Sequence, residues 1–208
     1  MDVKTECYTY TAGQTAIDSA IFADGWQGRL GVGYEDLLWP ATGERLNAES
    51  FARYRKQGGS VILFTNTEEM VERAVLSPLT MIASDGILRN GVGHPRSTGT
   101  YARVLVRYVR EKKALGLMEA VRKMALMPAH RLEKRVGGLR SKGRFRVGAD
   151  ADVVVFDLGN VRDLSDYGKP GVLSEGFRWV MVGGVLVVED GRPQEERMAG
   201  RAVRGEVR

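Results

Sequence analysis

Two charged residues on either side of a glycine-rich stretch are the first candidates for chemistry. Asp85 ends the short apolar run Met81–Ser84, and Arg96 follows a His-Pro step eleven residues later. A carboxylate at the end of a strand can accept and return a proton, whereas a guanidinium presents a planar fork that binds a carboxylate with two hydrogen bonds. The simpler alternatives are an aspartate that caps a turn before Gly86 and an arginine that faces solvent. The pair therefore indicates either an acid–base site with an anion clamp or an ordinary surface loop.

Histidine and cysteine, the usual ligands of zinc, are scarce in this chain. It has two histidines, His94 and His130, and one cysteine, Cys7. His94 stands two residues before Arg96, so we expect it to contact the substrate or to support the residues that do; a purely structural role and a pH-dependent role both remain open. Cys7 cannot form an internal disulfide, which fits a reducing compartment, and we interpret it as a small buried apolar residue.

The composition is that of a soluble globular protein and argues against several kinds of partner. Of the 208 residues, 43% are hydrophobic and 27% are charged, which suits one domain, or one domain with a small appendage. The net charge is +5, but there is no zinc-finger spacing, recognition-helix signature or base-stacking motif, so we expect no nucleic-acid partner. The longest apolar stretch, Trp179–Val188, is too short to span a bilayer, and the first residues lack the apolar core of a signal peptide. We therefore expect a cytoplasmic protein with no membrane partner.

The sequence before Asp85 alternates between strand and helix patterns. Ser60–Phe64 and Leu79–Ser84 have the short apolar runs of buried strands, and Thr67–Val75 between them is typical of a helix that begins at a threonine cap. This order predicts a βα unit followed by a parallel strand, with Asp85 at the end of the second strand. Earlier still, Gly13–Leu46 has no sustained period, and a loop of that length is uncommon unless it is functional.

The rest of the chain divides into helices and a small β unit. Thr100–Lys113 and Leu117–Met127 each carry apolar residues at helical spacing. Beyond residue 138 the pattern changes to short strands and glycine turns. Phe177–Arg192 predicts a hairpin, in which Gly183 and Gly184 supply the positive φ angles of a tight two-residue turn.

Three stretches of the sequence, taken together, resemble one protein family. They are YTYTAGQT (residues 8–15), the segment from SDG to RLE with HPRSTGT inside it (residues 84–133), and KGRFRVGADADVVVFD with the later VMVGGVLVVEDG (within residues 142–191). They resemble the metal-dependent amidohydrolases, specifically the N-acyl-D-amino-acid deacylases, or D-aminoacylases. The middle stretch is highly specific for this family, whereas the last is shared across the wider superfamily. The resemblance covers most of the chain from Met81 onward and is patchier before it.

The resemblance implies an α/β fold, namely the C-terminal part of a (β/α)8 TIM-type barrel plus a small β-sandwich appendage. Residues 1–136 would form the partial barrel, with its last strands and helices and with residues 13–46 as an insertion that shapes specificity for the substrate's side chain. Residues 137–208 would form the small β-sandwich, which is a composite domain in this family.

The resemblance also implies roles for individual residues. Asp85 corresponds to the acid that contacts metal and takes a proton from the attacking water. Arg96 and Tyr8 stand at positions that hold the substrate's carboxylate end, with His94 beside them. Tyr8 opens the family's Tyr-Pro-Tyr-Thr-Ala motif, although Thr9 replaces the proline here. Of the family's metal ligands the sequence offers only Asp85, because it contains no His-x-His and neither histidine stands at a ligand position.

The enzyme that the resemblance implies uses zinc to hydrolyse the amide bond of N-acyl-D-amino acids, so small N-acyl amino acids are the expected ligands. This chain alone should not bind zinc tightly, because a catalytic zinc needs about three protein ligands. We expect a truncated reading frame. The alternatives are a subunit that complements a separate half carrying the metal ligands, and a non-catalytic module that binds carboxylates. The cut strand edges of a partial barrel also predict self-association of the isolated chain.

Overall fold

A pair of parallel strands and the helix between them form the centre of the structure, a computed structural model that describes residues 3–205. β1 (Thr5–Cys7) pairs in parallel with β6 (Thr80–Ile82). α3 (Glu68–Leu76) precedes β6, and its buried valines share one core with this strand. Because parallel strands end at the same edge, Tyr8 after β1 and Asp85 after β6 belong to one side of the molecule.

The strand before α3 does not pair as the sequence predicted. The order strand, helix, strand over residues 60–84 is confirmed, but the prediction that the two strands are parallel neighbours is wrong. β5 (Ser60–Phe64) lies between β2 (Ala12–Ala16) and β3 (Leu37–Trp39) and is antiparallel to both. An apolar run specifies a buried strand but not its partner, and β2 offers β5 a ladder of five residue pairs.

The stretch predicted to be irregular is a small folded unit built on aromatic side chains, which we call the aromatic unit (residues 12–64). Its sheet has the order β2-β5-β3-β4, and Trp39 on β3 stacks on Tyr54 with ring centroids 4.1 Å apart. Aromatic residues without a regular spacing can close a core because each buries a large area. The remaining elements of this unit are β4 (Glu44–Arg45), α1 (Trp26–Leu30), α2 (Ala48–Gln57) and the short 3₁₀ helices η1 (Ala20–Phe22) and η2 (Tyr34–Asp36).

Two helical runs follow the parallel strands. The helix predicted at Thr100–Lys113 begins four residues earlier, at Arg96, and its second half is a π-helix whose Tyr108 is fully buried. The first run is α4 (Arg96–Arg103) and the π-helix η3 (Val104–Glu111). The second run is α5 (Leu117–Val121), the π-helix η4 (Arg122–Leu126) and α6 (Met127–Leu132), after which comes the 3₁₀ helix η5 (Gly137–Ser141).

The C-terminal sheet is antiparallel, with the order β12-β11-β10-β9. The predicted glycine turn is confirmed, because Gly183 and Gly184 have φ angles of 56° and 87° between the strands of a hairpin. Val154 and Val155 point to opposite faces and are 51% and 44% exposed, so neither face of this single layer is fully covered within residues 3–205. The four strands are β9 (Val153–Phe156), β10 (Phe177–Val182), β11 (Val185–Glu189) and β12 (Arg192–Pro193).

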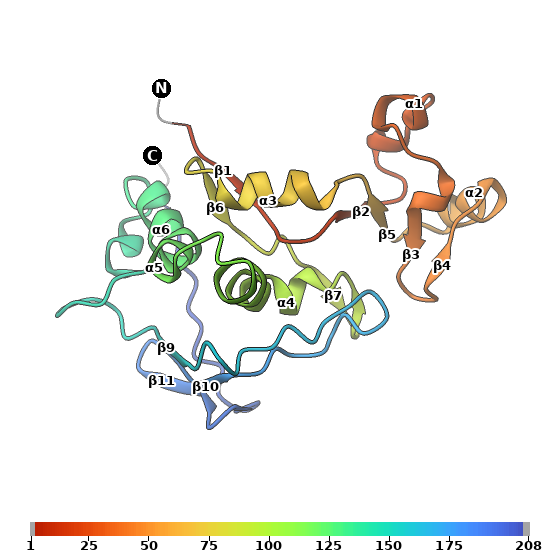
Figure 1. Cartoon of the computed structure of the whole chain (residues 1–208). Coiled ribbons are helices and arrows are strands. Elements are labelled where there is room, and N and C mark those ends of the chain that lie inside the picture. The colour runs from red at the N-terminus through yellow and green to blue at the C-terminus, as the bar shows by residue number, and fades with distance from the viewer. Residues whose placement is uncertain (1–2, 206–208) are drawn as a thin grey trace.

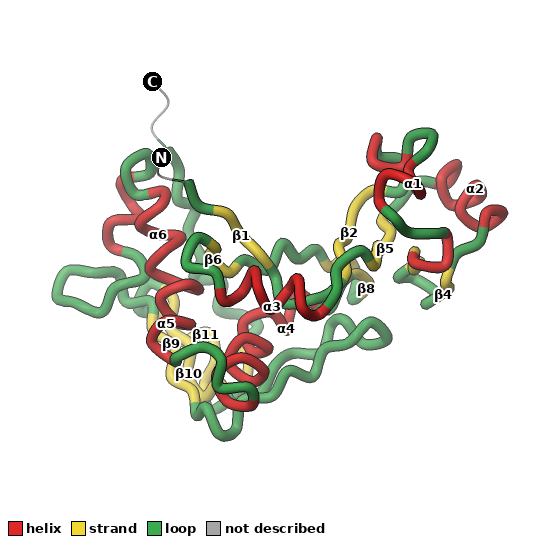
Figure 2. The backbone as a smooth tube through the Cα atoms, turned by 45° about the horizontal axis from the view of Figure 1, so that its top comes forward, coloured by secondary structure: helices red, strands yellow, loops and turns green. Residues whose placement is uncertain are grey.

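Two excursions connect these parts. A small hairpin, β7 (Leu88–Arg89) with β8 (Val92–Gly93), separates β6 from α4. The connection from β9 to β10, residues 157–176, leaves the C-terminal sheet, runs beside α4 and turns back near β7 (Figure 1). Figure 2 shows the aromatic unit, with α1 and α2, at one end of the molecule and α6 at the other. No helix in the described part of the chain is long and apolar enough to cross a bilayer.

Candidate active site

The loop between β6 and α4 brings together the two charged residues predicted to do chemistry. Asp85 follows β6 by three residues, and Arg96 is the first residue of α4. Nη2 of Arg96 lies 2.8 Å from Oδ2 of Asp85, so the two side chains form an ion pair. The chain therefore leaves β6, makes the β7–β8 hairpin and returns to the place where it started.

Two glycines hold this loop closed. A Cβ atom on Gly86 would lie 2.4 Å from Cα of Ser97 in the first turn of α4, so there is no room for a side chain. Gly93 has a φ of 152°, and a Cβ atom there would lie 2.3 Å from the carbonyl oxygen of Ile87. Such close backbone approaches are open only to glycine. The short distance between Asp85 and Arg96 is thus built into the backbone.

The Arg96 side chain is buried, and not all of its hydrogen-bond donors have an acceptor. It is 2% exposed, and its Cζ atom lies 4.3 Å from the centroid of the Tyr8 ring, a cation–π contact. Its Nε atom is buried and has no hydrogen-bond partner among residues 3–205. A buried donor without an acceptor costs about 1–3 kcal/mol. Arg96 therefore keeps an unused donor with which it can bind an anion.

Asp85 presents the opposite situation. Its side chain is 69% exposed, although it pairs with the buried Arg96. Its backbone φ is 47°, in the left-handed region that aspartate tolerates better than most residues. Backbone strain of this kind concentrates at functional sites. The carboxylate is thus held out from the loop, where a reacting group can reach it.

Tyr8 links the parallel strands to the aromatic unit. Its ring covers the guanidinium of Arg96, and a Cβ atom added to Gly13 on β2 would lie 3.1 Å from its hydroxyl oxygen. The residue predicted to contact substrate is therefore next to the candidate carboxylate-binding group. Thr9, which stands at the proline position of the motif, is buried, and its carbonyl oxygen accepts a hydrogen bond from Arg103.

His94 is fully buried, and both of its ring nitrogens are engaged by backbone groups. Nδ1 accepts a hydrogen bond from the backbone N–H of Arg96 at 3.0 Å, and Nε2 lies 2.9 Å from the carbonyl oxygen of Ala12. Nε2 must then carry the proton and donate it to Ala12. Burial and the nearby Arg96 charge lower the pKa of His94 to about 3, so it is neutral at physiological pH. Its geometry favours a role in holding Arg96 in place over direct contact with a ligand.

A groove of about 570 Å³ opens beside this loop, between the aromatic unit and the β7–β8 hairpin. Ile87 and Gly93, which lie between Asp85 and Arg96 in the chain, line one side of it. Gln14, Trp39 and Ser60 from the aromatic unit line the other. A ligand held at the loop has room to extend toward the aromatic unit.

Several known proteins similar to this chain are deacylases. It is 41% identical over 143 residues to the N-acyl-D-glutamate deacylase of Alcaligenes xylosoxydans xylosoxydans. The matched residues make up 69% of this chain and 28% of that protein. It is 36% identical over 136 residues to the N-acyl-D-aspartate deacylase of the same organism, 65% of this chain and 26% of that protein. A solved D-aminoacylase superposes with a TM-score of 0.75 at 30% identity, covering 97% of this chain and 43% of that one. The N-acyl-D-glutamate deacylase of Bordetella bronchiseptica superposes with a TM-score of 0.71 at 31% identity, covering 92% of this chain and 41% of that one.

The chain belongs to the N-acyl-D-amino-acid deacylase family of amidohydrolases. No family model matches it. It spans about 28% of the first relative and 43% of the D-aminoacylase structure, which agrees with the predicted C-terminal portion of a longer deacylase. The structure of the Bordetella enzyme contains zinc and a phosphonate that mimics the tetrahedral intermediate. Another of the similar structures is a D-aminoacylase described as having a binuclear metal center.

The residues of this chain do not fit a metal centre of that kind. Within residues 3–205, no group of three or more histidine, cysteine, aspartate or glutamate side chains could hold a metal ion. The carboxylate of Asp85 pairs with an arginine. Burial raises the pKa of the Cys7 thiol to about 11, so it stays protonated, and His130 is an exposed residue of α6 beside Glu133. A catalytic zinc needs about three protein ligands, and this set falls short of that number.

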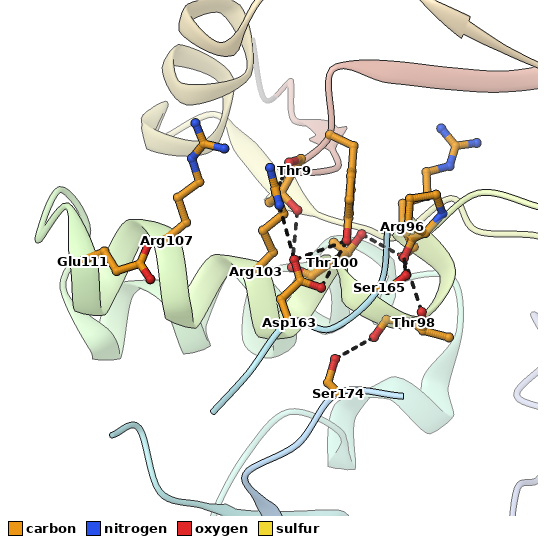
Figure 3. A network of polar contacts seen from close by, with 12 residues as sticks. Thr9, Arg96, Thr98, Thr100, Arg103, Arg107, Glu111, Asp163, Ser165 and Ser174 are labelled. Atoms are coloured by element: carbon orange, nitrogen blue, oxygen red, sulfur yellow. Dashed lines mark hydrogen bonds and ion pairs between the residues drawn. The ribbon is translucent and has the colours of Figure 1, made fainter. Parts of the chain in front are cut away.

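Three residues near the site were missed by sequence reasoning: the buried Tyr10, the partly buried Arg103 and Asp163, whose side chain is 7% exposed. The Tyr10 hydroxyl oxygen and Nη1 of Arg103 each lie 3.3 Å from a carboxylate oxygen of Asp163, and Figure 3 shows Asp163 between Arg103 and the start of α4. Burial raises the pKa of the Asp163 carboxyl, while Arg103 opposes that rise. Asp163 lies in the connection between β9 and β10, which has no helix or strand period, so no local pattern marks it.

Proposed function

We propose that this chain supplies the carboxylate-binding and proton-transferring part of a hydrolase that acts on N-acyl-D-amino acids. The observation that carries the proposal is the state of Arg96. Its guanidinium is buried, one nitrogen bonds to the exposed Asp85, and Nε has no partner within residues 3–205. A guanidinium with one unused N–H donor is suited to a ligand carboxylate, which can accept hydrogen bonds from two of its nitrogens at once.

Binding of the substrate would exchange one carboxylate for another. The α-carboxylate of an N-acyl amino acid accepts hydrogen bonds from Arg96, while the Tyr8 ring remains packed on the guanidinium. Asp85 loses its partner in this exchange, and because its side chain is 69% exposed it can turn toward the scissile amide without crossing packed protein. Binding of the substrate carboxylate and release of the Asp85 side chain are thus coupled through Arg96.

Asp85 then acts as the proton carrier. It accepts a proton from the attacking water as the water oxygen bonds to the acyl carbon, and it gives that proton to the nitrogen as the C–N bond breaks. The products are a carboxylic acid and a free D-amino acid. Activation of the acyl carbonyl must come from groups outside residues 3–205, because the donor set of this chain does not fit a metal.

The architecture we infer for this function is a partial barrel. β1, α3, β6 and α4 would be the last strands and helices of a TIM-type barrel, in residues 1–136, and the C-terminal sheet would belong to a small β-sandwich in residues 137–208. Residues 1, 2 and 206–208 of these ranges lie outside the described part of the chain. Two observations support this: the match to 43% of a D-aminoacylase structure, and the uncovered valines of β9.

The groove beside the loop is our candidate site for the substrate's side chain or acyl group. It is lined by the aromatic unit, which contains the predicted specificity insertion 13–46, and by Arg89 of the β7–β8 hairpin. The Alcaligenes relatives at 41% and 36% identity are deacylases of N-acyl-D-glutamate and N-acyl-D-aspartate. N-acetyl-D-glutamate is therefore the first substrate to test.

A complementing polypeptide that carries the metal ligands is the partner we propose, in a cytoplasmic setting that suits the single cysteine. Without it, the open edges of β1 and β6 favour self-association of the isolated chain. Light scattering of the purified chain is expected to give a mass above that of a monomer. A clean, stable monomer would count against the partial-barrel architecture.

Hydrolysis of N-acetyl-D-glutamate in the presence of zinc tests the function. The chain is assayed alone and mixed with the part of the Alcaligenes N-acyl-D-glutamate deacylase that lies outside the match. We expect no turnover by the chain alone, turnover in the mixture, and its loss when Asp85→Asn replaces the wild type. Turnover by the chain alone would contradict the account.

The second candidate function is a non-catalytic module that binds carboxylates, and the same Arg96 geometry favours it. It predicts that the chain binds N-acetyl-D-glutamate but that no mixture turns it over. An active mixture therefore excludes this candidate, whereas an inactive mixture beside an active intact relative supports it.

A further inference from the structure

A segment from the C-terminal part of the chain reaches the start of α4 and contributes a buried acid there. Asp163 lies in the connection 157–176, and its side chain is 7% exposed. It accepts hydrogen bonds from the Tyr10 hydroxyl at 3.3 Å and from Nη1 of Arg103 at 3.3 Å (Figure 3). An acid this buried is normally paired, and both of its partners lie beside residues of the candidate active site.

The first route from Asp163 toward the site passes through Arg103. Arg103 uses Nη1 for Asp163 and donates from Nε to the carbonyl oxygen of Thr9 at 2.9 Å. Thr9 directly follows Tyr8, whose ring covers the Arg96 guanidinium. The charge of Asp163 thus fixes an arginine that in turn fixes the backbone beside Tyr8.

The second route passes through Tyr10 and His94. The Tyr10 ring is 4% exposed and meets the His94 ring edge to face, with centroids 5.4 Å apart. His94 accepts the backbone N–H of Arg96. Asp163 holds the Tyr10 hydroxyl, so it sets the position of the ring against which His94 packs.

The backbone of α4 is fitted closely to this pair. A Cβ atom on Gly99 would lie 2.1 Å from the Tyr10 hydroxyl oxygen and 2.3 Å from Oδ1 of Asp163. The same connection makes three further bonds to the start of α4: the hydroxyls of Ser165 and Ser174 donate to the carbonyl oxygens of Pro95 and Thr98, and the Thr98 hydroxyl donates to that of Pro170. The connection therefore grips the first turn of α4, where Arg96 sits (Figure 3).

We propose that Asp163 is a positioning residue for the Arg96 carboxylate clamp, acting through Arg103 and Tyr10 from the C-terminal part of the chain. This rests on the proposed function in one respect, because it takes Arg96 as the group that binds the ligand. Asp163 itself touches no ligand. Its role is to keep Tyr8 and the Arg96 backbone in the geometry that the ligand requires.

The test compares Asp163→Asn with wild type by NMR on the free chain. The substitution keeps the size of the side chain and removes its charge. We expect the Arg96 amide, which bonds to His94 Nδ1, to exchange with solvent about tenfold faster, and the His94 ring signals to lose their single-tautomer pattern. Affinity for N-acetyl-D-glutamate, measured by calorimetric titration, should fall by about fivefold or more.

Two further variants keep the test decisive. Asp190→Asn is the matched control, because Asp190 pairs with Arg178 on the surface and should leave all three readouts unchanged. Tyr10→Phe keeps the ring and the Asp163–Arg103 pair but removes the hydroxyl, and should give a smaller change of the same kind. If Asp163→Asn fails to fold, Tyr10→Phe decides the matter. The inference is overturned if Asp163→Asn, or in its absence Tyr10→Phe, behaves like Asp190→Asn at the Arg96 amide and the His94 ring.

The readouts separate this inference from the proposed function. A wild-type chain that does not bind N-acetyl-D-glutamate defeats the proposed function, yet the Arg96 amide and the His94 signals still report whether Asp163 positions them. A wild-type chain that binds, with an Asp163→Asn variant that binds equally well, defeats the inference alone.

Discussion

The two ends of the Asp85–Arg96 loop are built in opposite ways. Arg96 is 2% exposed and is held by the Tyr8 ring, by His94 and by the first turn of α4. Asp85 is 69% exposed, has a left-handed backbone and forms an ion pair with Arg96. The Arg96 end of the loop, which we call the complete end, is thus buried and held from several sides, whereas the Asp85 end, which we call the open end, faces solvent.

Arg96→Lys, at the complete end, should have the largest effect on ligand affinity. A lysine cannot present two donors in one plane, and its charge would be compact and strongly hydrated in a buried place. We expect affinity for N-acetyl-D-glutamate to fall by about tenfold to a hundredfold, because one charge-assisted bond of a bidentate pair is lost. Calorimetric titration measures this. An Arg178→Lys variant, at an exposed ion pair, serves as the control and should bind as wild type does.

Gly86→Ala changes the close contact between the loop after Asp85 and the first turn of α4. The new methyl group would lie 2.4 Å from Cα of Ser97, so the loop and the first turn of α4 must separate. Overpacking of this kind costs about 1–3 kcal/mol of unfolding free energy, which urea unfolding followed by circular dichroism can measure. Gly28→Ala, where a Cβ atom meets no neighbour within 4 Å, is the matched control and should cost little. An equal loss in both variants would contradict the close packing of Gly86.

The buried histidine at the complete end makes the stability of the chain depend on pH. The pKa of His94 is lowered from 6.5 to about 3, so below pH 6.5 the unfolded chain takes up a proton that the folded chain does not. The free energy of unfolding therefore falls as pH falls from 6.5 toward 3. From about pH 7 to about pH 5.5, we expect His94 to contribute a loss of about 1 kcal/mol.

Two histidine variants isolate this contribution in urea unfolding at both pH values. His94→Gln should lose stability less steeply on acidification than wild type, because it has no ring to protonate. His130→Gln, at an exposed position beside Glu133, should keep the wild-type slope. Equal slopes for all three proteins would show that His94 is not buried in its neutral form.

Asp85→Asn, at the open end, should strengthen ligand binding, whereas Arg96→Lys weakens it. The exposed carboxylate competes with a ligand for Arg96, so its neutralisation should tighten binding of N-acetyl-D-glutamate. The gain is small, about twofold to fivefold, because an ion pair with an exposed partner is worth little more than about 1 kcal/mol. The same titration measures it, and weaker binding by this variant would show that Asp85 helps to hold the ligand.

The sequence was informative where the chemistry is local. Asp85 and Arg96 lie in one glycine-rich loop, so their proximity could be anticipated, and the pair Gly183 and Gly184 marked its turn by residue type alone. The start of α4 at Arg96 was missed because no side chain caps it: Pro95 stands at the cap position in a helical conformation. Local pattern gives an element its type, and boundaries without a capping group remain unmarked.

Long-range partners were the part that the sequence did not reveal. β5 has the pattern of a buried strand, but only the three-dimensional structure shows that β2 and β3 are its neighbours. The role of Asp163 depends on contacts with Tyr10 and Arg103, which lie far from it in the chain, and its own segment has no periodic pattern. Contacts of this kind depend on how the connection 157–176 passes α4, which residue types do not specify.

Titration of the wild-type chain with a matched pair of ligands tests the central claim most directly. N-acetyl-D-glutamate carries the α-carboxylate that Arg96 is proposed to hold, and N-acetyl-D-isoglutamine has an uncharged amide in its place. The account predicts saturable binding of the first ligand and binding of the second that is weaker by about tenfold or more. Equal affinity for the two ligands, or binding of neither, would contradict it.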